Sequence, residues 1–306
     1  MLDMLLPHAI ILCLNNYDLR NLCEIRMRRN LPIIICLKGR NMPLTKDGKL
    51  FGEKIYANNE LFDFVLKKAT ENSLYAYNNQ IKQGFITAIG GIRLGIAGES
   101  VNSDNFMPTT MKNINSINIR VPHEVKDCSN VAFKFIYNKD SGIKSTLIIS
   151  PPGAGKTTLL RDVSRKISLV GESVIYNTLL VDERFEIAST VNGCPLLDVG
   201  EYTDVVSGAS KKFAFSNGIR ALRPDVIITD ELMGKEDVDA CKKAVLAGVR
   251  VIATLHGDGI NILRNKKEFC DVLTNKIFDR YIVLSNRNGV GTYEGVFDEN
   301  LNCIYC

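Results

Sequence analysis

Long apolar runs are missing from this sequence, and a membrane-spanning helix would need about 18–20 consecutive apolar residues. Residues 1–14 are rich in apolar side chains, but Asp3 and Pro7 interrupt them. They also lack the basic start and the small-residue cleavage site of a signal peptide. We therefore expect an amphipathic helix packed on its own domain there. With 45% hydrophobic and 24% charged residues, the whole chain is expected to be a soluble globular protein.

An excess of charge of one sign is also missing. The chain has 38 basic and 34 acidic residues and a net charge of only +4. It has no basic stripe with interleaved aromatic residues, which nucleic-acid-binding surfaces typically carry. Charge alone thus gives no reason to expect binding to nucleic acid or to an anionic membrane.

A disulfide framework and a zinc site are missing as well. The nine cysteines are scattered singly, and their odd number without framework spacing is typical of reduced thiols in the cytosol. Cys303 and Cys306 form a Cys-x-x-Cys pair, but no second pair or histidine cluster completes a zinc site. We expect no metal or redox role for these two cysteines.

What the sequence does contain is a phosphate-binding loop. An apolar strand at 147–149 runs into a Gly/Pro turn, then into Gly-Lys-Thr-Thr at 155–158 and a helical run. Backbone N–H groups of such a turn and the helix N-terminus face the phosphates, and Lys156 adds a point charge. The hydroxyl of Thr157 lies where a Mg²⁺ ligand is needed. The residues expected to bind the nucleotide are Pro152, Gly153, Ala154, Gly155, Lys156, Thr157 and Thr158.

The loop departs from the usual pattern at one position. The pattern G-x-x-x-x-G-K-[ST] begins with glycine, and Ser150 stands there in this chain. Because this position only opens the turn, a small residue can serve, and the prediction of a P-loop stands.

The pattern of elements predicts two domains. Residues 1–126 form an α+β domain, 127–144 a linker, and 145–306 an α/β domain in which strands and helices alternate around a mostly parallel sheet. In the first domain we expect a hairpin at 33–41, a helix at 59–70, a hairpin around Gly90-Gly91 at 84–98 and a strand at 114–121. In the second we expect strands at 145–149, 173–181, 226–229 and 249–255, and a closing antiparallel hairpin at 281–297.

Carboxylates follow the strand predicted at 226–229. A P-loop needs one carboxylate to hold the metal, directly or through water, and usually a second one to orient water. Asp230 and Glu231 supply both, so we expect Asp230 to face Mg²⁺ and Glu231 to polarise the attacking water. This predicts hydrolysis rather than transfer; the alternative is a strand end with two solvated acids.

Two other strand ends carry polar residues. In a parallel sheet the carboxyl ends of the strands gather at one edge, where ligands bind. Asp182 and Glu183 can therefore reach the outer shell of the metal, or equally form a local salt bridge with Arg184. His256 follows the strand at 249–255 and is expected to sense the γ-phosphate; the alternative is a structural histidine. Arg220 or Arg223 can contact a phosphate, a neighbouring subunit or a surface acid.

This combination resembles the secretion-ATPase branch of the P-loop ATPases, with its acidic box and histidine box. More narrowly, it is similar to the stage III sporulation protein AA family over nearly the whole chain. Besides the P-loop, the resemblance rests on Ser73–Tyr77, Gln83–Thr87, Gly91–Gly95, Ile117–Arg120, Val181–Ala188, Asp198–Gly200, Thr203–Val205, Arg223–Glu231, Thr254–Gly257 and Arg280–Ser285.

The resemblance implies a RecA-like core and an ATPase that uses ATP and Mg²⁺. It implies a homo-hexamer in the mother-cell cytoplasm that acts on membrane proteins of a sporulation channel complex and meets the membrane only through them. Nucleotide would bind between the two domains, completed by arginines of the N-terminal domain, for which Arg93 and Arg120 match. Pairing of these arginines with local acids is the alternative.

Other classes fit the sequence less well. Val206–Ser210 mimics part of the ABC-transporter signature, but the second glycine and the glutamine of that signature are missing. A nucleic-acid translocase would need the basic stripe that is absent. A scaffold that binds nucleotide without hydrolysing it would lack the catalytic base, whereas this chain has Glu231. A GTPase would have a guanine-recognising aspartate at the last position of the segment Asn265–Glu268, where this chain has a glutamate.

Overall fold

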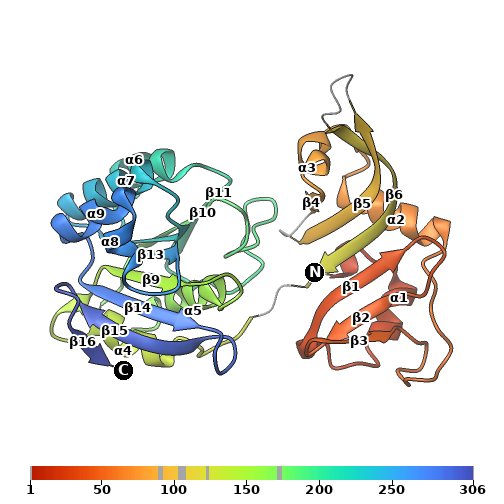
Figure 1. The fold of residues 1–306 in the computed structure, drawn as a ribbon, viewed down its shortest axis with the longest axis horizontal. Coiled ribbons are helices and arrows are strands. Elements are labelled where there is room, and N and C mark those ends of the chain that lie inside the picture. The colour runs from red at the N-terminus through yellow and green to blue at the C-terminus, as the bar shows by residue number, and fades with distance from the viewer. Residues whose placement is uncertain (1, 89–91, 103–107, 122–123, 171–173, 306) are drawn as a thin grey trace. The chain divides into compact units, whose positions relative to one another are not determined.

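The computed structural model describes residues 2–88, 92–102, 108–121, 124–170 and 174–305. The chain divides into two compact units, Met1–His123 and Glu124–Cys306, which are described separately below (Figure 1). Residues 127–144 were expected to be a linker between the domains, but in the structure they belong to the second unit. This segment contains a helix whose Ala132 and Ile136 are fully buried in the core of that unit.

The first unit is an antiparallel sheet covered by helices on one face. Its six strands lie in the order β3-β2-β1-β6-β5-β4. Alternate residues, such as Ile25 and Met27 in β1 and Ile117 and Ile119 in β6, point into one core with α1 and α2. The elements are η1 (Leu2–Met4), α1 (His8–Leu14), η2 (Leu19–Asn21), β1 (Leu22–Arg28), β2 (Ile34–Leu37), β3 (Arg40–Pro43), α2 (Asn59–Ala69), α3 (Asn78–Lys82), β4 (Phe85–Thr87), β5 (Arg93–Asn102) and β6 (Pro108–Arg120).

The second unit is built on an eight-stranded sheet in the order β11-β10-β12-β13-β9-β14-β15-β16. The first six strands are parallel, and β15 and β16 add an antiparallel edge. The elements are α4 (Asn130–Ile136), β7 (Tyr137–Asn138), β8 (Gly142–Ile143), β9 (Thr146–Ser150), α5 (Lys156–Ile167), β10 (Thr178–Asp182), β11 (Thr203–Ser207), α6 (Lys211–Ala221), β12 (Val226–Glu231), α7 (Lys235–Leu246), β13 (Arg250–His256), α8 (Ile262–Asn265), α9 (Lys267–Thr274), β14 (Arg280–Ser285), β15 (Thr292–Asp298) and β16 (Cys303–Tyr305).

Helices cover both faces of this sheet (Figure 1). Successive residues of β9 enter different cores: Leu147 and Ile149 pack with α6, α7 and α9, whereas Ile148 packs with α4 and α5. Strands buried on both faces have a continuous apolar stretch, as β9, β10 and β12 do. The predicted α/β unit with a mostly parallel sheet is thereby confirmed.

The strand predictions omit β1, β7, β8, β11 and β16, and they differ from the structure in the bounds of other strands. β10 begins at Thr178 rather than near residue 173. β11 was not expected, because its half-buried residues lack the apolar character of the inner strands. β14 pairs in parallel with β9, so the closing hairpin extends the main sheet. The turn expected around Gly90-Gly91 lies outside the described residues.

The cysteines agree with the expectation except at one position. Seven of them are free: Cys13, Cys23, Cys36, Cys128, Cys194, Cys241 and Cys270. Cys303 is disulfide-bonded, so the expectation that it is a thiol is wrong, and Cys306 lies outside the described residues. None of the helices in the described part of the chain is long and apolar enough to cross a membrane.

Candidate nucleotide site

The P-loop joins β9 to α5. Gly153 and Gly155 have φ angles of 72° and 86°, a left-handed region where a residue with a Cβ is strained. Within the described residues no side chain caps the N-terminus of α5, which leaves its first N–H groups open to an anion. Ser150 is fully buried, and its hydroxyl donates to the Pro151 carbonyl at 3.1 Å, so a small polar residue opens the turn.

The ammonium of Lys156 lies over this loop. It donates to the carbonyl oxygens of Ser150 at 3.0 Å and Pro151 at 3.2 Å. Partial burial lowers its pKa, and the negative charge of Glu231 works in the opposite direction. Lys156 therefore lies on the loop, within the influence of the Glu231 charge at the end of β12.

The carboxyl ends of the parallel strands bring the predicted residues to one edge. His256 of β13 is in register with Ser150 of β9, and Glu231 of β12 is in register with Thr254 of β13. The N–H of Gly257 donates to the Ser150 carbonyl at 3.1 Å, which ties the histidine strand to the start of the P-loop. His256 itself is exposed, as a residue that meets a ligand must be.

Asp230 has a partner that the sequence reasoning missed. The ammonium of Lys211, only 2% exposed, lies 2.8 Å from Asp230 Oδ1 and 2.6 Å from Glu183 Oε2. Burial raises the pKa of Asp230 to about 6, although Lys211 pulls it down. The signal in the sequence is a lysine directly after the N-cap Ser210, in a first helical turn where cations are disfavoured.

The carboxylate of Asp182 binds backbone N–H groups of the loop that follows β10. Its buried carboxylate accepts the N–H groups of Glu186 at 2.9 Å, Ile187 at 3.1 Å and Ala188 at 2.8 Å. Buried Arg161 of α5 donates to carbonyls of the same loop, those of Ile187 and Glu186. Asp182 is thus held by the loop and Glu183 by Lys211, and an outer-shell role of either residue toward a metal stays a prediction.

The four predicted arginines belong to two different units. Arg93 and Arg120 belong to the first unit, where they flank the paired residues Leu94 and Ile119 on neighbouring strands. The Arg93 guanidinium stacks over the Phe85 ring, 4.3 Å from its centroid, and Arg120 is exposed. Their role toward a nucleotide stays a prediction. Arg220 and Arg223 are exposed residues of the second unit.

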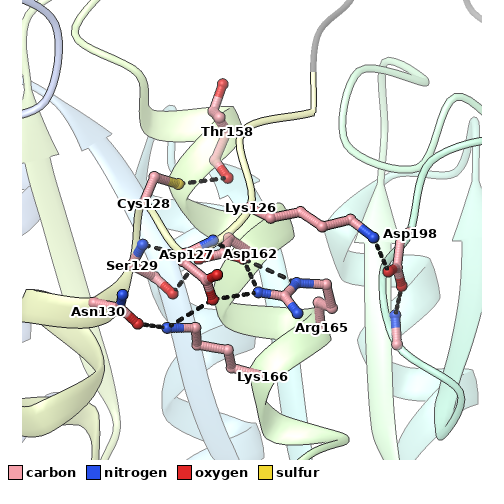
Figure 2. A network of polar contacts seen from close by, with 11 residues as sticks. Lys126, Asp127, Cys128, Ser129, Asn130, Thr158, Asp162, Arg165, Lys166 and Asp198 are labelled. Carbon is pink, nitrogen blue, oxygen red and sulfur yellow. Dashed lines mark hydrogen bonds and ion pairs between the residues drawn. The ribbon is translucent and has the colours of Figure 1, made fainter.

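A polar network fastens the start of the second unit to the P-loop helix (Figure 2). The carboxylate of Asp162, 3% exposed, accepts the Asp127 N–H at 3.0 Å, the Ser129 N–H at 2.8 Å and the Ser129 hydroxyl at 2.6 Å. Arg165 bridges Asp162 and Asp127 at 2.7 and 2.9 Å. Burial opposes the charge of Asp162, but the bonds from Ser129 and Arg165 outweigh it and lower the pKa.

Asp162→Asn should destabilise the second unit by about 2–4 kcal/mol, because asparagine leaves Arg165 with only the exposed Asp127 as a counter-charge and cannot accept all these bonds. Since the folded pKa is below the ordinary value of about 4, the stabilisation is present above that pH and disappears as pH falls through the folded pKa. Urea unfolding at pH 7 and pH 3 measures the difference. Asp127→Asn, at a 64% exposed side chain, is the matched control and should cost under about 1 kcal/mol.

The oxygens at this edge suit a hard divalent cation. Mg²⁺ prefers hydroxyl, carboxylate and phosphate oxygens and is commonly held by one or two carboxylates plus the phosphates of a substrate. Thr157 and Asp230 offer such oxygens beside the P-loop. Among the described residues, no group of three or more His, Cys, Asp or Glu side chains could hold a metal ion alone. The donor set thus fits an ion that arrives with a nucleotide.

Comparisons with known proteins give the family and the fold. The family model described as "Sporulation stage III, protein AA" matches residues 4–304. Stage III sporulation protein AA of Bacillus subtilis (strain 168) is 32% identical over 282 residues, which are 92% of this chain and 88% of that protein.

Two solved structures are similar in fold. The Legionella pneumophila ATPase DotB has a TM-score of 0.56 at 14% identity, covering 89% of this chain and 74% of its own. The pilus retraction motor PilT with bound ADP has a TM-score of 0.53 at 16% identity, covering 90% and 75%. These likenesses confirm a RecA-like core with a smaller N-terminal domain. Because the family model spans the chain almost from end to end and the Bacillus relative agrees over 92% of it, the chain belongs to the sporulation stage III, protein AA family.

Proposed function

We propose that this protein is an ATPase that binds ATP with Mg²⁺ at the P-loop of the second unit and hydrolyses it. The observation that carries the proposal is the position of Lys156, held over the P-loop carbonyls and influenced by the charge of Glu231 at the end of β12. A phosphate-binding cation and a carboxylate base thus lie at the same edge of the sheet. That is the arrangement that P-loop hydrolysis needs.

Each residue at the edge has a distinct role in this proposal. The backbone of Pro152–Thr158 cradles the phosphates, and Lys156 compensates their charge. Thr157 and Asp230 face Mg²⁺, which when bound neutralises charge on the phosphate oxygens. Glu231 orients and polarises the attacking water, and His256 contacts the γ-phosphate. Glu183 supports Asp230 through their shared partner Lys211.

We propose further that the ATPase drives a sporulation-associated membrane channel complex from the mother-cell cytoplasm. The family and the Bacillus relative, both named for stage III of sporulation, support the process. The fold likeness to a protein described as a pilus retraction motor supports a mechanical role. The chain would act as a homo-hexamer, with membrane proteins as its partners, and Arg93 and Arg120 of the first unit would complete the site.

Lys156→Ala should weaken ATP binding at least about tenfold, because the phosphates lose a fixed, partly buried cation. Titration of purified protein with a fluorescent ATP analogue in the presence of Mg²⁺ measures this loss. Lys144→Ala, a lysine just before β9 and outside the loop, is the control and should bind normally. Equal ATP binding by wild type and Lys156→Ala would overturn the assignment of the site.

A further inference from the structure

Lys211 lies where elementary electrostatics disfavours a cation. It is the first residue of α6, next to the positive end of the helix dipole, and its side chain is only 2% exposed. The next residue, Lys212, has a side chain that is 74% exposed and pairs with Glu236 at 3.7 Å on the surface. The chain therefore buries one lysine of an otherwise similar pair, and that lysine points toward the nucleotide edge.

Two carboxylates from different strands compensate Lys211. Its ammonium lies 2.6 Å from Glu183, directly after β10, and 2.8 Å from Asp230 of β12. Asp237 of α7 adds a further negative charge nearby. Burial opposes the charge of Lys211, but these acids outweigh it and raise its pKa. The ammonium thus lies between the carboxylates of two acidic strand ends.

The two neighbouring acids at the end of β12 interact with different lysines. Asp230 is paired with Lys211, whereas Glu231 acts on Lys156 of the P-loop. Glu231 is thereby left to face the nucleotide side, and Asp230 is already compensated inside the protein. A carboxylate that shares an ammonium is a weak ligand for a free dication, because the two cations repel each other.

We propose that Lys211 is a positioning residue that acts as an internal counter-ion: it holds Glu183 and Asp230 together and prevents the strand ends from taking a divalent cation when no nucleotide is bound. The inference rests on the proposed ATPase function and makes it more specific. Bound ATP would supply, through its phosphates, the Mg²⁺ ligands that the carboxylates alone do not offer. Lys211 thus couples occupancy of the metal position to occupancy of the P-loop.

Binding of Mn²⁺ to the nucleotide-free protein tests this directly, with free Mn²⁺ quantified by electron paramagnetic resonance. Wild type should bind it weakly. Lys211→Met should bind it at least about tenfold more tightly, because two uncompensated carboxylates a few ångströms apart attract a dication. Lys212→Met removes the same charge from the exposed neighbour and should behave as wild type. Lys211→Met/Glu183→Gln should return toward the weak binding of wild type.

If Lys211→Met does not fold in metal-free buffer, millimolar Mn²⁺ should restore its melting transition, because the ion takes the place of the ammonium. A folded Lys211→Met protein that binds Mn²⁺ no more tightly than wild type overturns the inference, as does an unfolded one that Mn²⁺ does not restore. Failure of the ATPase proposal is recognised separately, as wild-type protein that binds ATP and does not hydrolyse it.

Discussion

Glu231→Gln should bind ATP as wild type does and hydrolyse it about 10²–10⁴-fold more slowly, the usual contribution of a positioned general base. Glutamine keeps the size and hydrogen-bonding shape of the side chain but cannot accept a proton from water. Phosphate release under saturating ATP and Mg²⁺ measures the rate, and a fluorescent nucleotide measures the affinity. A normal affinity for ATP together with a reduced rate of hydrolysis distinguishes the role of Glu231 from that of Lys156, whose loss weakens ATP binding.

The control for this variant is Glu236→Gln. Glu236 lies in the first turn of α7, where its side chain is 79% exposed and forms a surface ion pair with Lys212. It should hydrolyse ATP at the wild-type rate. Full activity in Glu231→Gln would contradict the assignment of Glu231 as the base.

The same variant also tests the proposed partner. Glu231→Gln protein loaded with ATP should stay in its nucleotide-bound state and retain whatever that state binds. Recovery of small integral membrane proteins from sporulating cells would support the channel complex. Recovery of nucleic acid, together with ATPase activity stimulated by DNA, would instead favour a translocase.

The features that the sequence predicted correctly are those with a local signature. Residues 147–158 read as strand, turn and helix because the turn needs glycine and the strand is buried on both faces. The placement of Glu231 and His256 at one edge of the sheet follows from parallel strand order, since parallel strands end on the same side. The fold class could be predicted for the same reason.

What the sequence could not predict depends on contacts between distant residues. The ends of β10 and β12 both read as acidic, yet Asp182 accepts three loop N–H groups while Asp230 pairs with a lysine of α6. The two roles have the same local sequence pattern and differ only in what packs beside them. Likewise α4 looked like linker, because its seven residues become a stable helix only against the sheet.

The arginine proposal makes the largest prediction about assembly. Arg120 is exposed at the end of β6, and its register partner Glu24 is already held by Arg26 at 2.7 Å. An arginine placed on developing phosphate charge is typically worth about 10³-fold or more in rate, so Arg120→Ala should lose about that factor. Arg93→Ala should reduce the rate by a smaller factor, because the Arg93 guanidinium is already engaged by the Phe85 ring.

Mixing experiments decide whether the arginine acts on its own subunit or on a neighbour. Subunits with Arg120→Ala have an intact P-loop, and subunits with Lys156→Ala have an intact arginine, so mixed rings should regain part of the wild-type rate if the site is shared. The control for loss of a surface charge is Arg40→Ala, at an exposed position of the edge strand β3. This variant should hydrolyse ATP normally. Because neither parent variant can hydrolyse ATP efficiently alone, recovered phosphate release reports a composite site directly. No recovery at any mixing ratio, with assembly verified by light scattering, would show that Arg120 does not complete a neighbouring subunit's site.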